Sequence, residues 1–203
     1  MSYHSQDFYQ FQFDAGLSRV LKMFEVDGRK TKAEKITGNT FEIDTNASGA
    51  VTQVVRTELS RKGETEVSIY SDANGDQRFE KTFEIEVAGA STRFLEQHRF
   101  TFDSAGNVTA EMERKGNGAW KSERIDANEH FQLLSLNGVN YLVKTETERD
   151  GIEFTLLRDD NGDGIWSQIA EGETTGLHLN GATGTIDLVG IQSYLVGADS
   201  IVG

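Results

Sequence analysis

Apolar and polar residues alternate along most of the central part of the chain. The clearest example is FEKTFEIEV, where aromatic and aliphatic residues occupy one set of alternate positions and glutamates lie between them. A period of two is typical of a β-strand with one buried and one exposed face. The pattern predicts strands between about residues 40 and 171, most clearly at 51–59, 79–87, 141–143 and 152–156.

Short strings rich in Gly, Asn and Asp separate these stretches and are typical of tight turns. The runs between them hold about seven to eleven residues, too few for a crossover helix. Consecutive strands are therefore expected to pair antiparallel. The predicted turns lie at residues 46–49, 61–63, 73–76, 88–90, 104–107, 115–118, 137–138, 150–151 and 161–164.

The turns belong to a degenerate internal repeat. The strings TELSRKG, AEMERKG and TETERDG are variants of one another, and each precedes a strand and then a turn that begins with Asp72, Asp126 or Asp159. GAVT and GNVT open the strands before the first two copies. A single hairpin repeat cannot bury its apolar face, so the copies are expected to share a core.

The N-terminal region has a different pattern. Alternating aromatic residues predict a short strand over residues 9–13. Apolar residues then recur with helical spacing, which predicts one helix over residues 15–26, with Asp14 as its N-cap and Gly28 as its stop. Four basic residues between 29 and 35 predict a solvated loop.

Together these features predict an all-β fold, an antiparallel up-and-down meander of about 10–12 strands with one N-terminal helix. The sheet is expected to be barrel-like or a sandwich, and a small propeller is the alternative. Three regions are expected. Residues 1–39 form a strand and helix flanking the sheet, 40–173 the hairpin meander, and 174–203 a Gly-rich apolar C-terminal segment.

Composition narrows the possible partners. The net charge of −13 argues against a nucleic-acid partner, which needs a basic surface. The absence of Cys excludes disulfides and thiolate metal sites. No apolar run approaches the length of a membrane span, so none is expected.

The two ends bear on localisation. The N-terminal residues do not form a basic region followed by an apolar one, so no ordinary secretory signal is expected. The tail has no Lys or Arg and resembles the uncleaved C-terminal signals of proteins exported by bacterial type I machinery. That resemblance implies an extracellular protein exported without a signal peptide. A cytoplasmic location and a tail that simply supplies the last strands remain the alternative.

The string DDNGDGIWS carries oxygen-bearing side chains at alternate positions. It resembles the calcium loops of integrin, FG-GAP and VCBS-type β-repeats, with the pattern Asp-x-Asn-x-Asp-Gly-x-x-Asp, although its last position is Ser. Calcium prefers such oxygens, and an Asx-stabilised hairpin turn needs the same residues without a metal. The implied calcium ligands are Asp159, Asn161, Asp163, the carbonyl of Ile165 and Ser167.

The other repeat turns have fewer candidate ligands. SDANGD offers Asp72, Asn74 and Asp76 as a second calcium loop, although an Asn-Gly type I′ turn explains the same string. The turns that begin at Asp103 and Asp126 are predicted to be turns only. The string around Asp103, FDSAGNVT, resembles the bacterial YD-repeat, which supports a hairpin there.

Histidine and tryptophan offer separate hypotheses. The four His have no zinc-site spacing. Glu96 and His98 share the predicted face of one strand, where they either satisfy each other or anchor a ligand inside a β-barrel. Trp120 and Trp166 follow Gly-rich turns, where an indole can stack on a sugar or seal the end of a sheet.

No catalytic constellation is predicted. The chain lacks GxSxG, a dinucleotide fingerprint and a Walker loop. The sequence therefore favours a non-enzymatic, calcium-binding β-repeat module of an exported bacterial protein. The alternative is a ligand-binding β-barrel with Glu96 and His98 facing an internal cavity. Calcium is the expected partner, and a protein or glycan partner is not specified by the sequence.

Overall fold

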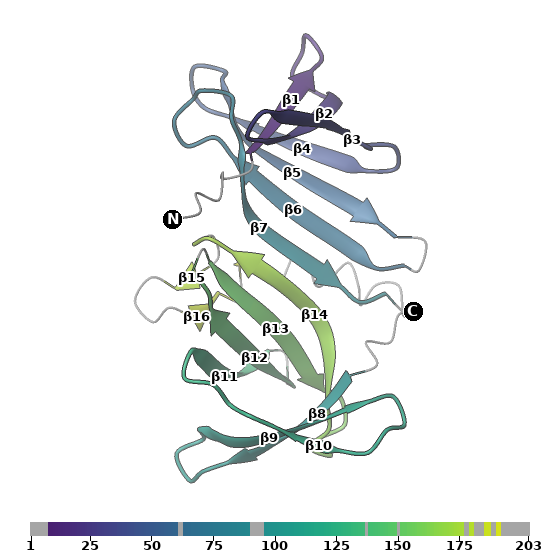
Figure 1. The fold of residues 1–203 in the computed structure, drawn as a ribbon, viewed down its shortest axis with the longest axis vertical. Helices are drawn as coiled ribbons and strands as arrows, with labels where there is room; N and C mark the ends of the chain where they lie inside the picture. The colour runs from purple at the N-terminus through teal and green to yellow at the C-terminus, as the bar shows by residue number, and fades with distance from the viewer. Residues whose placement is uncertain are drawn as a thin grey trace. The chain divides into compact units, whose positions relative to one another are not determined.

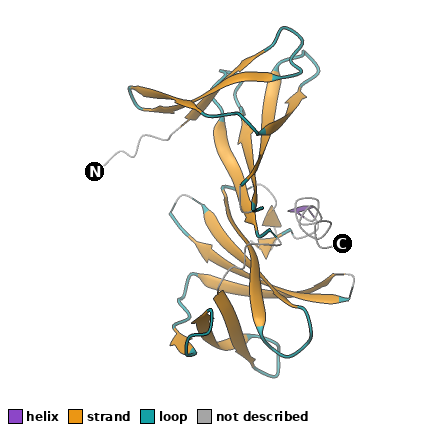
Figure 2. Ribbon diagram, turned by 90° about the vertical axis from the view of Figure 1, so that its right-hand side faces the viewer, coloured by secondary structure: helices purple, strands orange, loops and turns teal. Residues whose placement is uncertain are grey.

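The computed structural model describes residues 8–60, 63–89, 96–136, 138–149, 151–176, 179–180, 185–187 and 190–191. Strands dominate, and helical backbone among these residues is confined to Gly190 and Ile191 (Figure 2). The prediction of an all-β antiparallel fold is confirmed. The predicted helix over 15–26 is wrong.

The described residues contain sixteen strands rather than ten to twelve. Most follow one another as antiparallel hairpins, as the turn spacing predicts. Their bounds are β1 Phe8–Phe13, β2 Val20–Asp27, β3 Lys30–Glu34, β4 Thr40–Thr45, β5 Val51–Leu59, β6 Thr65–Ser71, β7 Glu80–Val87, β8 Glu96–Phe102, β9 Val108–Lys115, β10 Lys121–Glu123, β11 Glu129–Leu136, β12 Val139–Thr147, β13 Ile152–Asp159, β14 Trp166–Thr174, β15 Leu179–Asn180 and β16 Thr185–Ile186 (Figure 1).

The chain divides into two compact units. Unit 1 comprises Met1–Ser60 and Glu66–Glu84, and unit 2 comprises Arg61–Thr65 and Ile85–Gly203. The boundary therefore falls inside β7, between Glu84 and Ile85.

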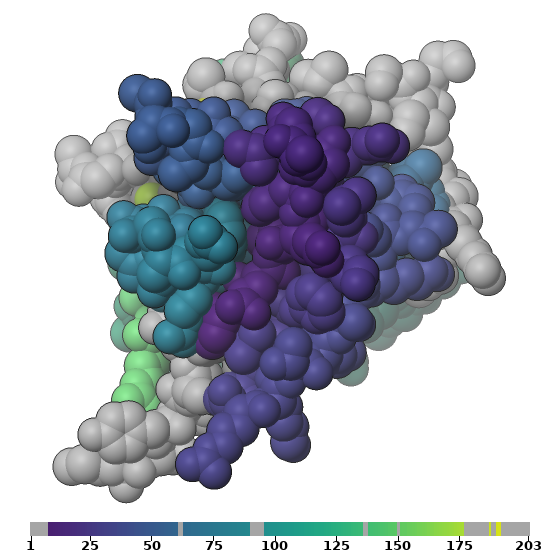
Figure 3. Space-filling model, turned by 90° about the horizontal axis from the view of Figure 1, so that it is seen from above, coloured from purple at the N-terminus to yellow at the C-terminus, as the bar shows by residue number. Residues whose placement is uncertain are grey.

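Unit 1 consists of two antiparallel layers. Strands β1, β2 and β3 form one sheet, and β4, β5, β6 and the start of β7 follow one another in the other. Tyr9 of β1 bridges to Phe79, just before β7, with Tyr9 N donating to Phe79 O at 2.7 Å. Strands β1 to β3, purple in Figure 3, lie over the blue and teal strands of the same unit.

The core of unit 1 is aromatic. Phe11 packs edge-on against Tyr70 and Phe79, with ring centroids 5.4 and 5.1 Å apart. Met23 and Val54 are buried in the same cluster. The alternating aromatic residues of β1 thus provide one side of this core, as a half-buried strand should.

A turn and a strand replace the predicted helix. Asp14 caps a turn in which its Oδ1 accepts hydrogen bonds from Ser18 N at 2.7 Å and Arg19 N at 3.1 Å. Leu17 has a φ of 52°, which a right-handed helix does not allow. The following residues form β2, which pairs with both β1 and β3. The predicted basic loop over 29–35 is likewise mostly β3, with Lys32 paired to Glu25 and Glu34.

Unit 2 is built around a curved antiparallel sheet. Its strands run in the order β10-β9-β8-β14-β13-β12-β11, and the end of β7 also lies beside β14. Leu142, Leu157 and Trp166 form the buried centre of one cluster on this sheet. Phe100 and Phe131 pack against that cluster with ring centroids 5.7 Å apart.

The described strands close into neither a barrel nor a propeller, so neither the barrel-like arrangement nor the propeller alternative is supported. Of the C-terminal segment 174–203, β15 and β16 are described and pair with each other. Most of the segment, including the stretch expected to act as an export signal, lies outside the described residues. Within the described part of the chain, no helix has the length and hydrophobicity needed to span a membrane.

Candidate functional site

The Asp159 loop connects β13 to β14 and is organised by its own side chains. Asp159 Oδ1 accepts a hydrogen bond from Gly162 N at 2.8 Å, and Oδ2 accepts one from Gly164 N at 3.1 Å. Asn161 Nδ2 donates to Asp163 Oδ2 at 3.1 Å, and Asp163 N donates back to Asn161 Oδ1 at 3.1 Å. The structure therefore brings Asp159, Asn161 and Asp163 together in one turn.

The Asp72 loop repeats this arrangement between β6 and β7. Asp72 Oδ1 accepts from Gly75 N at 2.7 Å and Oδ2 accepts from Gln77 N at 2.8 Å. Asn74 Nδ2 donates to Asp76 Oδ2 at 3.2 Å, and Asp76 N donates to Asn74 Oδ1 at 3.0 Å. The loop therefore shares these four hydrogen bonds with its counterpart, at equivalent positions.

Backbone conformation confirms that the two loops share one design. The fourth residue has a positive φ in both, 77° at Gly75 and 72° at Gly162. The sixth residue also has one, 64° at Gln77 and 76° at Gly164. The eighth residue is a buried aromatic in both, Phe79 or Trp166. Two of the three copies inferred from sequence thus share one conformation, whereas the Asp126 turn has no positive φ at its fourth residue, Glu129.

The donor chemistry of these loops is partly that of a calcium site. Each turn gathers two carboxylates and one amide, all hard oxygen ligands. No described group of three or more His, Cys, Asp or Glu side chains has a metal-binding arrangement. Ser167 lies in β14, paired with Arg158 and with Gln97 of β8, rather than in the turn. A bound ion would therefore need the Ile165 carbonyl and water to complete its shell.

A simpler Asx turn occurs at two other hairpins. Asp103 Oδ1 accepts from Ala105 N at 2.8 Å and from Asn107 N at 2.9 Å. Asn46 Oδ1 accepts from Ser48 N at 3.0 Å and from Ala50 N at 3.1 Å in the same way. These turns open the strands that begin with the repeated GNVT and GAVT strings. Both have only one Asx cap, in agreement with their prediction as turns.

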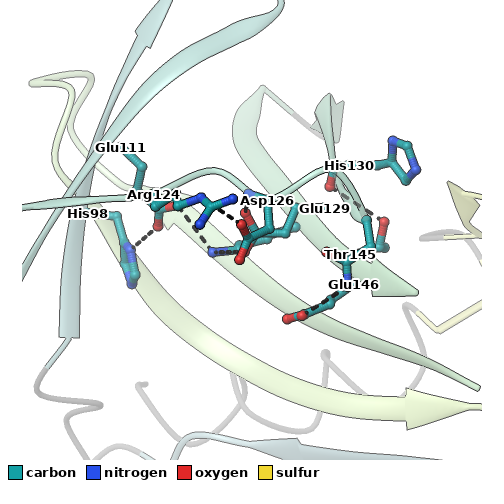
Figure 4. Close-up of polar contacts among 10 residues, drawn as sticks. His98, Glu111, Arg124, Asp126, Glu129, His130, Thr145 and Glu146 are labelled. Carbon is teal, nitrogen blue, oxygen red and sulfur yellow. Dashed lines mark hydrogen bonds and ion pairs between the residues drawn. The ribbon is translucent and has the colours of Figure 1, made fainter. Parts of the chain in front are cut away.

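A buried charge network lies in unit 2 (Figure 4). His98 Nδ1 on β8 donates to Glu111 Oε1 on β9 at 2.8 Å, and Lys144 Nζ on β12 donates to Glu111 Oε2 at 3.1 Å. Lys144 also pairs with Glu129 Oε1 at 2.8 Å, and Glu129 Oε2 accepts from Asp126 N at 2.7 Å. Since β9 and β12 are not neighbours in the sheet, this network connects separate strands across one face.

The charges of this network stabilise one another. Burial alone raises the pKa of the Glu111 carboxyl, but the hydrogen bond from His98 and the Lys144 ammonium outweigh it, and the pKa is lowered. Burial alone lowers the pKa of Lys144, but its bonds to Glu129 and Glu111 outweigh that effect, and the pKa is raised. Glu111 is therefore a carboxylate and Lys144 an ammonium at neutral pH.

His98 is left with one unsatisfied nitrogen. His98 is 7% exposed, and its Nε2 has no hydrogen-bond partner. Because the Glu111 carboxylate only accepts hydrogen bonds, Nδ1 of His98 carries a proton. Glu96, the expected partner of His98, instead forms an ion pair with Lys115. The structure thus places His98 with Glu111 and does not bring it together with Glu96.

The sequence pattern gives no indication of Glu111, Lys144 or Glu129 as members of a site. The apolar residues of β9 alternate as Val108, Ala110 and Met112, which suggests that they face inward. In the structure Val108 does pack against the core, but the register with β8 shifts after Val108, so that Glu111 is buried and Met112 is exposed. The carboxyl of Glu111 comes close to His98 through the pairing of β9 with β8, in which Glu111 lies opposite Phe100 and diagonal to His98.

Comparisons with known proteins identify no relatives. No protein-family model, curated protein or solved structure matches this chain.

Proposed function

We propose that the protein is a non-enzymatic β-hairpin repeat module that calcium stabilises through the Asp159 loop, with the Asp72 loop as a weaker second site. The observation that carries the proposal is the shared loop design, in which two carboxylates and an amide gather in one turn at both places. The Asp159 loop is the stronger candidate for a calcium site, because its carboxylates are more accessible than that of Asp72, which is 5% exposed.

Two further features fit an exported calcium-dependent module. Extracellular calcium modules bind with dissociation constants of about 10⁻⁴–10⁻³ M, an affinity suited to a site with only two carboxylates. The chain has no Cys, so its export would require no disulfide formation. In this proposal the module belongs to a bacterial protein that works outside the cell, where calcium is millimolar.

Thermal melting in a calcium titration tests the proposal. At about 100-fold above the dissociation constant, binding adds about 2.7 kcal/mol, or about 5–10 °C in Tm for a chain of this size. The double variant Asp159→Ala/Asp163→Ala should lose most of the shift. Asp103→Ala removes an Asx cap from a turn with one carboxylate and should keep the shift. The same Tm with and without millimolar calcium in the wild type would refute the proposal.

A second candidate function is the binding of a small polar ligand in unit 2. It is favoured by His98 Nε2, because a buried nitrogen without a hydrogen-bond partner costs about 1–3 kcal/mol. A ligand hydroxyl or amide that reached this nitrogen would remove that cost. Native mass spectrometry of protein purified from its source should then show a bound small molecule. His98→Phe should abolish the bound mass, whereas Glu96→Gln should retain it.

A further inference from the structure

The outer face of β8, β9 and β10 differs in charge from the rest of the molecule. The register of β8 and β9 places Arg99 opposite Met112 and Arg114 opposite Gln97. Ser122 of β10 continues this face opposite Met112. The charged residues on the face are arginines, although the chain as a whole has a net charge of −13.

Both arginines lie over one indole ring. Arg99 Cζ is 4.5 Å and Arg114 Cζ is 4.6 Å from the centroid of Trp120, in the turn before β10. Arg114 Nε donates to Gln97 Oε1 at 2.8 Å, which holds that guanidinium in a defined orientation. Neither arginine forms an ion pair with a described carboxylate, although acids outnumber bases in the chain by 33 to 20.

The contacts seen here leave these two positive charges uncompensated. Each cation–π contact contributes only about 0.5–1 kcal/mol at an exposed site. Two guanidiniums held near one ring repel each other, and their planar forks match a carboxylate better than a water molecule. The arrangement is therefore that of a site prepared for an anion, with the partly exposed Trp120 and the exposed Met112 beside it.

We propose that Arg99, Arg114 and Trp120 bind a carboxylated saccharide, such as a uronic acid residue. The guanidiniums would hold the carboxylate, and the carbon face of the sugar ring would pack against the remaining indole surface and Met112, which is 39% exposed. The proposed site differs from a tryptophan that stacks on a sugar by itself, because the ring of Trp120 already contacts Arg99 and Arg114.

Charge favours such a ligand over other anions. Nucleic acids and acidic peptides bring many negative charges toward a chain that already carries −13, and long-range repulsion opposes their approach. A single uronic acid brings one carboxylate to two guanidiniums. It also carries a ring of a size that one indole and one methionine can contact. Arg99, Arg114 and Trp120 belong to neither the Asp159 loop nor the Asp72 loop, so the proposal does not depend on calcium.

The experiment follows the nuclear magnetic resonance (NMR) signals of the indole N–H groups in the full chain. The protein has two tryptophans, and Trp166 is buried, so its signal is an internal reference. Sodium glucuronate is titrated in calcium-free buffer, which prevents a metal from bridging the sugar to the Asp159 loop. We expect a saturable shift of the Trp120 signal with glucuronate, a much smaller one with sodium acetate, and none with glucose.

Variants locate the site. Arg99→Gln and Arg114→Gln should each weaken glucuronate binding about tenfold or more, because a charge-assisted bond is lost. Arg99→Lys keeps the charge without the planar fork and should weaken binding by a smaller factor. Arg124→Gln removes one positive charge from a side chain that is 88% exposed and should change the affinity less than twofold.

The outcomes separate the proposal from simpler explanations. No saturable Trp120 shift with glucuronate overturns it. Equal affinity for acetate and glucuronate would show that the site binds anions without recognising the sugar ring, which overturns the saccharide assignment. Equal weakening by Arg99→Gln and Arg124→Gln shows general electrostatics and also overturns it. The Trp166 signal confirms in every variant that the core is intact.

Discussion

Glu111 is the most deeply buried acidic side chain among the described residues, at 1% exposed. A carboxylate without partners in this position would lose several kcal/mol of hydration. Its two oxygens instead accept hydrogen bonds from His98 and Lys144. The residue is therefore tolerated only as a member of the network, and each partner depends on it in turn.

Removing Glu111 should destabilise the protein strongly. Glu111→Ala leaves the ammonium of Lys144 with one carboxylate and His98 with two unsatisfied nitrogens, so we expect a loss of about 3–5 kcal/mol in the free energy of unfolding. Urea denaturation measures it as a lower midpoint with an unchanged slope. Glu123→Ala is the matched control, because Glu123 lies opposite Glu111 in the register but is exposed. Its effect should stay within about 0.5 kcal/mol, and equal losses in both variants would contradict the role given to the network.

At the scale of single elements, the Asp72 and Asp159 loops differ at one strained position. Gln77 and Gly164 occupy equivalent places with a positive φ, which costs a non-glycine residue about 1–2 kcal/mol. Asp72 accepts hydrogen bonds from the backbone of this loop and so stabilises the unfavourable conformation of Gln77. A Cβ at Gly164 would meet no atom within 4 Å, so conformation alone decides the effect of substitution there.

Exchanging these residues should move stability in opposite directions. Gln77→Gly should stabilise the protein by about 0.5–1 kcal/mol, since relief of the left-handed strain exceeds the extra entropy of Gly in the unfolded chain. Gly164→Gln should destabilise it by a similar amount. Chemical denaturation of both single variants and the double variant provides the measurement. Changes of the same sign, or no change in either, would show that the loops do not share one design.

The pattern of apolar residues predicted the strands well where one face is apolar. In β7, Phe83, Ile85 and Val87 are buried as their alternation predicts. The turn chemistry of the Asp159 and Asp103 loops was also visible, because Asx caps depend on neighbouring residues only. Element types that are fixed locally could therefore be predicted.

The elements that were predicted wrongly depend on distant partners. The spacing of Leu17, Val20 and Phe24 fits a helix, but pairing of β2 with β1 on one side and β3 on the other overrides that local preference. The burial of Glu111, which the sequence pattern does not indicate, depends on Lys144, 33 residues away in the chain. No short window of the sequence contains this information.

At the scale of the whole molecule, the excess of acids is the dominant electrostatic feature. At neutral pH and low salt, a net charge of −13 destabilises the folded state by self-repulsion. Salt screens this repulsion over about 10 Å at 0.1 M. Several acids are nevertheless individually stabilised by the fold. Hydrogen bonds from Asn107 lower the pKa of Asp103, those from Ser18 lower the pKa of Asp14, and the pKa of Glu111 is lowered as well.

These two effects oppose each other as the pH falls. Carboxyls with a lowered pKa in the folded state contribute stability above their ordinary pKa values and lose it as the pH falls through the folded values. Self-repulsion, in contrast, weakens as the pH falls from 8 toward the isoelectric point of about 4.7, because the net negative charge decreases. At low salt we therefore expect the urea midpoint to be higher at about pH 5.5 than at pH 8, and to fall steeply below about pH 4.

Salt and one substitution distinguish the two contributions. Adding 0.15 M NaCl, a value near physiological ionic strength, should raise the midpoint at pH 8 more than at pH 5.5, because only repulsion is screened at long range. Glu111→Gln should flatten the decline below pH 4, since it removes the most buried of the carboxyls whose protonation drives that decline. A midpoint that keeps rising to pH 3 would mean that repulsion outweighs every stabilised carboxyl. A midpoint at pH 8 that does not respond to salt would mean that the net charge does not limit the stability of this fold.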